Sequence, residues 1–146
     1  MPISGGFDAT ASRRFAETVQ RTEPFAESWE FDNRLGPSTV RIEMGEGFDA
    51  PGRFDVRWFN DDRYSIHYKE PATLGTNPTL EFRFDRHPKP GVADAHFRPP
   101  PDAGDPEDSC IQVRRTKLVA ITVGKLWRAA RNTGDLGLLN TARNSP

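Results

Sequence analysis

The sequence predicts an α+β fold: an antiparallel meander of four to five strands, a C-terminal helix packed on one face, and a short N-terminal helix. Three observations predict this fold. The middle of the chain contains runs in which apolar and polar residues alternate, as they do along half-buried strands. The connections between most of these runs are short, which favours antiparallel neighbours. Near both ends of the chain, apolar residues recur every three to four positions, as on amphipathic helices.

The first element is a short helix predicted over Thr10–Thr22. Phe15 and Val19 lie one helical turn apart and share a face, and Ser12 is the expected cap. Residues 28–32 (SWEFD) alternate in polarity and are predicted to form a strand or an extended arm. We expect residues 1–9 to be disordered.

Four strand-like runs follow, and each places three large apolar side chains on one face. The runs are TVRIEM (39–44), RFDVRWF (53–59), RYSIHYKE (63–70) and TLEFRFDR (79–86). The polar segment 60–62 predicts a hairpin turn between the second run and the third. Residues 71–78 are rich in Gly, Pro and Thr, so we expect a loop there.

Two shorter pieces extend the predicted sheet. Ala95–Arg98 is a short extended segment, and prolines 99–101 end it because proline cannot donate to a strand ladder. Residues 102–109 are expected to form an acidic, exposed loop, and residues 110–113 (CIQV) a fifth or edge strand. The meander would then lead directly into the C-terminal helix.

The C-terminal helix has the clearest helical pattern in the chain. Its apolar stripe consists of Val119, Val123, Leu126, Trp127 and Ala130. Thr116 is the expected cap at its start, and Gly134 is the expected left-handed residue at its end. Residues 135–146 are predicted to be a tail. The chain is thus expected to be a single domain, 1–146, that is structured over about 10–134.

Composition and charge limit the classes of protein. The one cysteine, Cys110, excludes an internal disulfide and a CxxC metal site. The N-terminal residues lack the apolar core of a signal peptide, and no run reaches the ~18 apolar residues of a membrane span. We therefore expect a cytoplasmic protein without membrane contact.

The net charge is −1, yet the part from Arg114 onward holds seven basic residues and one acid. This basic element is consistent with a nucleic-acid partner. Alternatively, it is a solvated helix face.

The same alternation that buries the apolar residues puts polar residues on the opposite face of the sheet. This face is predicted to carry His67 and Arg83, and also His96 and Arg98 if they extend the sheet with Phe97 pointing inward. Together with His87, which follows the fourth run, these are the candidate catalytic residues. Metal-independent RNA cleavage needs a base for the ribose 2′-hydroxyl, a cation for the phosphate and an acid for the leaving oxygen. Histidine can serve as base or acid near neutral pH, and the arginine fork matches phosphate oxygens. The alternative interpretation is the solvated side of a one-sided sheet with cross-strand ion pairs.

The histidines at positions 87 and 96 flank a loop rich in Pro and Gly. A stiff loop that presents polar groups is typical of a site on a scaffold. Together with a carboxylate, the two histidines could also hold a metal, but their spacing matches no zinc or facial-triad signature. We therefore predict neither a metal nor any other cofactor. Alternatively, the two histidines are simply exposed, while Asp85 and Asp94 cap turns.

This region resembles a known family. The residues that carry the likeness are the tripeptide Arg83-Phe84-Asp85, His87, His96 and the upstream strand RYSIHY. Over about residues 53–115 the chain is similar to the TumE family, the toxins of toxin–antitoxin pairs. The resemblance implies a metal-independent ribonuclease, or another toxin that acts on RNA, which a small DNA-binding antitoxin neutralises. The alternative function is a non-enzymatic domain that binds a protein partner.

Overall fold

The computed structural model describes residues 6–71, 80–87 and 95–141. These residues form one seven-stranded antiparallel sheet whose strands follow chain order. The strands are β1 (Ala26–Phe31), β2 (Val40–Met44), β3 (Arg53–Trp58), β4 (Tyr64–Glu70), β5 (Leu80–Arg86), β6 (Ala95–Arg98) and β7 (Glu107–Asp108). The helices are α1 (Ala9–Thr22), α2 (Thr116–Thr133) and the 3-10 helix η1 (Leu136–Asn140). The α+β class is confirmed, but the sheet has more strands than predicted. Apart from Pro71, the predicted loop 71–78 lies outside the described residues.

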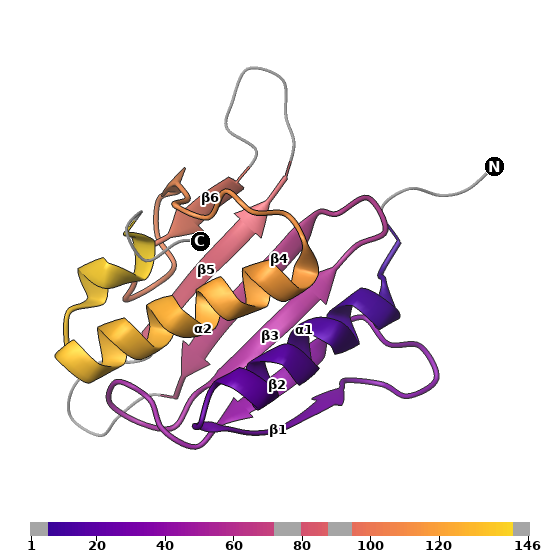
Figure 1. Cartoon of the computed structure of the whole chain (residues 1–146), viewed down its shortest axis with the longest axis horizontal. Coiled ribbons are helices and arrows are strands. Elements are labelled where there is room, and N and C mark those ends of the chain that lie inside the picture. The colour runs from indigo at the N-terminus through magenta and orange to yellow at the C-terminus, as the bar shows by residue number, and fades with distance from the viewer. Residues whose placement is uncertain (1–5, 72–79, 88–94, 142–146) are drawn as a thin grey trace.

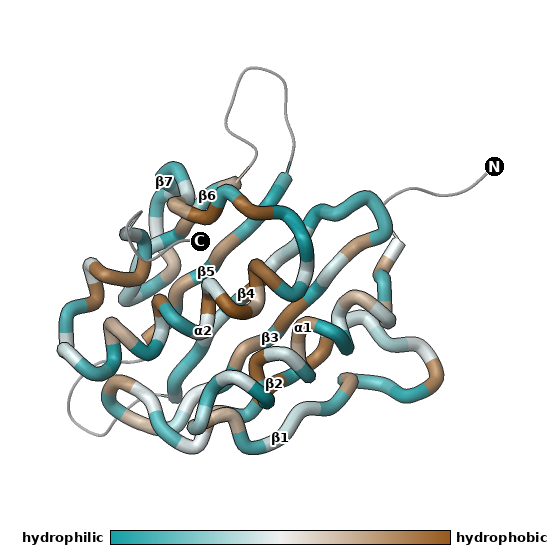
Figure 2. Tube along the Cα trace, in the orientation of Figure 1, coloured by the Kyte–Doolittle hydropathy of each residue, from teal (hydrophilic) through white to brown (hydrophobic). Residues whose placement is uncertain are grey.

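Both long helices cover the same face of the sheet. They lie side by side over the sheet and run in the same direction (Figure 1). Hydrophobic residues recur along the helices and the central strands, whereas the connecting segments are mostly hydrophilic (Figure 2). Because successive strand residues point to opposite faces, the apolar half of each strand meets the helices. The polar half is left on the face that no described helix covers, which we call the open face.

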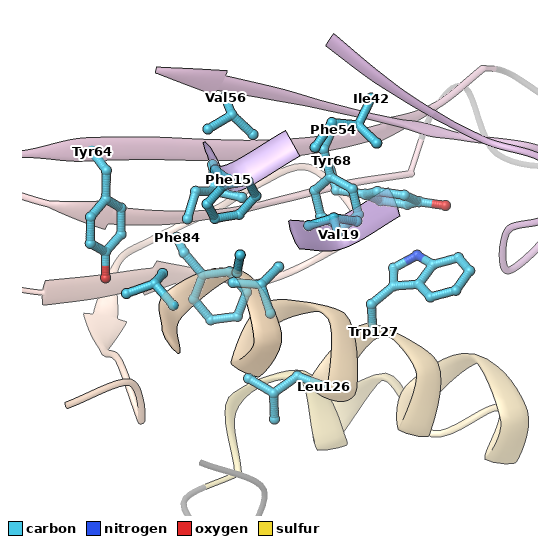
Figure 3. Close-up of a cluster of buried hydrophobic side chains, with 14 of the residues drawn as sticks. Phe15, Val19, Ile42, Phe54, Val56, Tyr64, Tyr68, Phe84, Leu126 and Trp127 are labelled. Carbon is cyan, nitrogen blue, oxygen red and sulfur yellow. The ribbon is translucent and has the colours of Figure 1, made fainter. Parts of the chain in front are cut away.

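The core between the helices and the sheet is rich in aromatic rings (Figure 3). Tyr68 stacks on Phe82 with ring centroids 5.0 Å apart, and Trp127 of α2 meets Tyr68 edge-on at 6.2 Å. Phe15 and Val19 of α1 are also buried, as the sequence predicted. Burial of one such side chain contributes roughly 1.5–3 kcal/mol, so the alternation determines which face receives the helices.

The helix starts differ from the prediction. Helix α1 begins at Ala9, and Asp8 precedes it as its cap, so this end of the stretch 1–9 is not disordered as predicted. Asp8 caps α1, because its Oδ1 accepts the backbone N–H of Ala11 at 3.0 Å. Ser12 is instead buried within α1, where its hydroxyl accepts the backbone N–H of Trp58 at 3.1 Å. Thr116 is the first residue of α2 rather than its cap, since Arg115 occupies the N-cap position. The predicted end of α2 is confirmed: Gly134 is left-handed, with φ of 75°.

The far edge of the sheet also differs from the prediction. The segment predicted as an acidic loop contains β7, whose residues pair with β6. Residues 110–113 form no strand, and the backbone N–H of Cys110 donates to Oδ1 of Asn140 at 2.7 Å. The predicted tail begins with η1, which buries Leu139 in the core. Burial of this one leucine brings Asn140 against the segment that leads into α2.

Candidate functional site

The polar side chains of the open face form rows that run across the strands. In an antiparallel sheet, residues that pair across neighbouring strands lie about 4.5–5.5 Å apart and share a face. The central row consists of Arg41, Asp55, His67, Arg83 and Arg98. The second row consists of Arg57, Ser65, Asp85, His96 and Asp108. Strand pairing therefore brings together residues that are up to 57 positions apart, from Arg41 to Arg98.

Two adjoining hollows lie over these rows. The first, here called the His67 hollow, encloses about 350 Å³, and its cationic lining is Arg41, Arg57, Lys69 and Arg83. The second, the His87 hollow, encloses about 370 Å³, and its cationic lining is Arg57, Arg63, Arg83, Arg86 and Arg98. Among the described residues, Asp85 is the only carboxylate that lines the His87 hollow. Arg57, Ser65 and Arg83 line both hollows, so these side chains form the wall between them.

His67 is the histidine best placed for proton transfer. Its ring is half-buried, and Nε2 lies 2.7 Å from Oε1 of Glu81 on the neighbouring strand. Burial lowers the pKa of His67 below the ordinary value of 6.5, and the charge of Glu81 offsets part of this decrease. The ring is therefore neutral at pH 7. When Nε2–H donates to Glu81, Nδ1 keeps its lone pair and can accept a proton.

The two predicted arginines are held next to each other. Arg83 pairs directly with His67 on one side and with Arg98 on the other. The Nε of Arg83 donates to Oδ2 of Asp85 at 3.0 Å, and the Nε of Arg98 lies 3.6 Å from the same oxygen. The Nη1 of Arg98 also donates to the carbonyl of Gly104 at 3.1 Å. One carboxylate thus positions two guanidinium groups and leaves net positive charge, which suits a bound phosphate.

The remaining two histidines differ in their position relative to the two hollows. His87 directly follows β5, is exposed, and lines the His87 hollow with Arg83 and Arg98. His96 faces the same side of the sheet, opposite Asp85 and Asp108, and within the described residues it lines neither hollow. The structure thus brings four of the five predicted residues to the two hollows and places His96 in the second row.

Sequence reasoning did not include Glu81 or Arg57 in the site. Both were visible on the open face from alternation alone. The contact of Glu81 with His67 runs diagonally, because His67 pairs with Arg83 and Glu81 pairs with Lys69. A diagonal contact depends on the strand register, which the local pattern does not reveal.

The described residues contain no group of three or more His, Cys, Asp or Glu side chains that could hold a metal ion. The considered set of His87, His96 and a carboxylate is therefore not assembled in this part of the chain. Asp94, one possible ligand, lies outside the described residues. The expectation of a metal-independent site stays a prediction.

The fold and the open face define a small α+β protein with an arginine-rich, histidine-bearing face suited to an anionic ligand. The chain matches the family model described as Toxin TumE over residues 15–128, and it belongs to that family. The match confirms the predicted resemblance. The predicted region was about 53–115, and the matched region 15–128 also includes most of α1 and most of α2. The family consists of toxins of toxin–antitoxin systems, so an antitoxin partner is implied.

Two further comparisons add no relative: neither the curated proteins nor the solved structures gave a match. Across the described residues, no helix is both long and apolar enough to cross a membrane.

Proposed function

We propose that this TumE-family toxin is a cytoplasmic, metal-independent ribonuclease whose site is the open face of the sheet. The observation that carries the proposal is the position of Arg83, which forms the wall between two hollows that each contain a histidine. An isolated arginine on a sheet would not indicate a ligand site, since surface charges are common. Here the cations outnumber the carboxylates around both hollows, and that excess supports a phosphate ligand.

The reaction assigns one task to each group. His67, oriented by Glu81, takes the proton of a ribose 2′-hydroxyl, and the 2′-oxygen attacks the adjacent phosphorus. Arg83 and Arg98 hold the phosphate oxygens as negative charge builds on them. The bond from phosphorus to the 5′-oxygen breaks, and that oxygen receives a proton from His87. The products are a 2′,3′-cyclic phosphate and a free 5′-hydroxyl.

His96 is the second candidate for the acid, because it lies on the same face and beside Asp85. Each proton transfer of this kind contributes typically about 10²- to 10⁴-fold to a rate.

The partner that neutralises the activity is, in this proposal, a small DNA-binding antitoxin.

The products of the reaction test the proposal. We expect the purified protein to cleave RNA in the presence of EDTA and to leave 2′,3′-cyclic phosphate ends. An RNA with a 2′-deoxy sugar at the cleaved position should remain intact, because it lacks the nucleophile. Mass spectrometry of the fragments checks both statements. A folded protein that inhibits growth but cuts no RNA would refute the nuclease proposal and favour the alternative, a non-enzymatic interaction domain.

The pH dependence of cleavage provides a second test. The rate should rise with pH through the pKa of His67, below 6.5, because the base must be neutral. The charge of Glu81 raises this pKa, so the change Glu81→Gln should move the acidic limb of the pH–rate profile to lower pH. Glu43→Gln, a change on the same face but on β2, is the matched control and should leave the limb in place. An unmoved acidic limb in Glu81→Gln would exclude His67 as the titrating base.

A further inference from the structure

The basic C-terminal element divides into two parts. In the later turns of α2 its arginines are paired: the Nε of Arg128 lies 3.7 Å from Oε1 of Glu23, and the Nη2 of Arg131 lies 3.1 Å from Oε1 of Glu46. The earlier part is arranged differently. A hollow of about 390 Å³ at the start of α2 is lined by four cations: Arg14, Arg114, Arg115 and Lys117. We call these four residues the basic cluster.

The basic cluster is assembled by tertiary structure. Both long helices begin at the same end of the helical layer (Figure 1). Arg14 of α1 lines the same hollow as the first residues of α2. Asp62, in the turn between β3 and β4, is the one carboxylate among the described residues that line this hollow. Within the described part of the chain, Arg14, Arg115 and Lys117 form no ion pair.

In the unbound protein, the position of the basic cluster is electrostatically unfavourable. The first turn of α2 contains no acidic residue, and no side chain caps it. The N-terminal end of a helix carries partial positive charge, so cations there repel the helix dipole as well as one another. A bound polyanion would remove this repulsion. The paired arginines near the end of α2 show the opposite arrangement, in which the protein supplies its own acids.

A series of shared residues links the basic cluster to the candidate site. Arg114 also lines a hollow of about 310 Å³ that includes Tyr64 and Arg86. Tyr64 and Arg86 in turn line the His87 hollow. The Nη1 of Arg86 donates to the carbonyl of Asp62 at 2.9 Å, which holds this arginine beside the hairpin turn. The three hollows therefore adjoin. Arg114 lies where the hollow of the basic cluster meets the 310 Å³ hollow, and Arg86 lies where the 310 Å³ hollow meets the His87 hollow.

We propose that the basic cluster is a second RNA-binding site, which holds backbone phosphates of the same strand at a distance from the cleaved bond. This inference rests on the proposed function, and it makes the substrate an extended single strand rather than a short fragment. A single strand carries one charge per nucleotide and can follow a curved, basic surface. The strand would pass from the open face, around the β3–β4 turn, to the start of α2.

RNA binding with a matched pair of variants tests the second site. The probe is a fluorescein-labelled RNA of about 20 nucleotides with 2′-O-methyl sugars, which binds but cannot be cleaved, and the readout is anisotropy over a salt series. The cluster variant is Arg115→Gln with Lys117→Gln. The control is Arg21→Gln with Lys125→Gln, which removes the same charge from exposed positions further along the two helices.

We expect the cluster variant to raise the Kd about tenfold at physiological salt and to flatten the slope of log K against log salt by about 0.7 per lost phosphate contact. The control should change the Kd less than twofold. A trinucleotide probe should bind the wild type and the cluster variant equally, because it fills only the open face. Circular dichroism checks that both variants are folded.

Each possible result of the binding assay leads to a different conclusion. Equal weakening in both variants would show a general effect of net charge and would overturn the second site. An unchanged Kd in the cluster variant would also overturn it, while the cleavage proposal would stand. Absence of RNA binding by the wild type would overturn both. Loss of affinity limited to the cluster variant would support the second site even if no RNA were ever cleaved.

Discussion

The change Arg83→Ala should lower kcat for RNA cleavage by about 10²- to 10³-fold, the loss typical when one charged stabiliser of a transition state is removed. Arg83 lies opposite His67 and lines both hollows, so its guanidinium can reach a phosphate beside either histidine. The effect should fall mainly on kcat, because the negative charge on the phosphate oxygens is greatest in the transition state. Single-turnover kinetics at saturating RNA measure it.

A matched cation on the same face controls for general charge. Arg53 lies on β3 outside both hollows, with its Nε 3.5 Å from Oδ2 of Asp55. Arg53→Ala should therefore leave kcat within about twofold, as expected for a change remote from the reacting groups. Arg83→Lys should recover only part of the rate, because an ammonium group keeps the charge but not the planar fork. Wild-type kcat in Arg83→Ala would refute the proposed phosphate clamp.

The second large effect concerns stability. Glu70 is 1% exposed, and its carboxylate accepts the backbone N–H groups of Phe48, Asp49 and Ala50 at 2.6, 2.9 and 3.1 Å. The hydroxyl of Tyr68 donates to the same carboxylate, and burial, with the charge of Glu70, raises the pKa of Tyr68 so that it stays protonated. One buried side chain thus holds the loop between β2 and β3.

We expect Glu70→Gln to lower the free energy of unfolding by about 3 kcal/mol, since hydrogen bonds to a charged group contribute about 1.5–3 kcal/mol each. Glutamine keeps the shape, but it replaces one acceptor oxygen with an NH₂ group that faces N–H donors. Urea unfolding should show a lower midpoint with an unchanged m-value.

An exposed glutamate provides the comparison for this change. Glu17→Gln, on the outer face of α1, should change the free energy of unfolding by less than about 0.5 kcal/mol. If Glu70→Gln were as mild as Glu17→Gln, the carboxylate would not be what holds the loop.

The sequence located most of the secondary structure because alternation is a local property. The strands β2 to β5 and the inward position of Phe97 follow from which residue of each pair is apolar. The same parity put His67, Arg83, His96 and Arg98 on one face before any strand pairing was known, whereas His87 lay beyond the predicted strand. Parity also accounts for the burial of Glu70, which follows Tyr64, Ile66 and Tyr68 at every second position.

Other features depended on partners that lie far away in the chain. Residues 107–108 form a strand only because β6 offers them a free edge, and η1 forms where Leu139 can enter the core. Asp8, not Ser12, caps α1, and the Ser12 hydroxyl instead accepts the N–H of Trp58. In each case the energy that decides the conformation comes from a contact across the fold.

By itself, the sequence determined the fold class, the open face and the residue types on it. Only the tertiary structure decided that His67 lies opposite Arg83, that Glu81 reaches His67 diagonally, and that Arg14 joins the start of α2. The physical reason is that the face of a strand residue is set by neighbours one or two positions away. The register of paired strands and the packing of helices are set by the summed burial of side chains from distant segments.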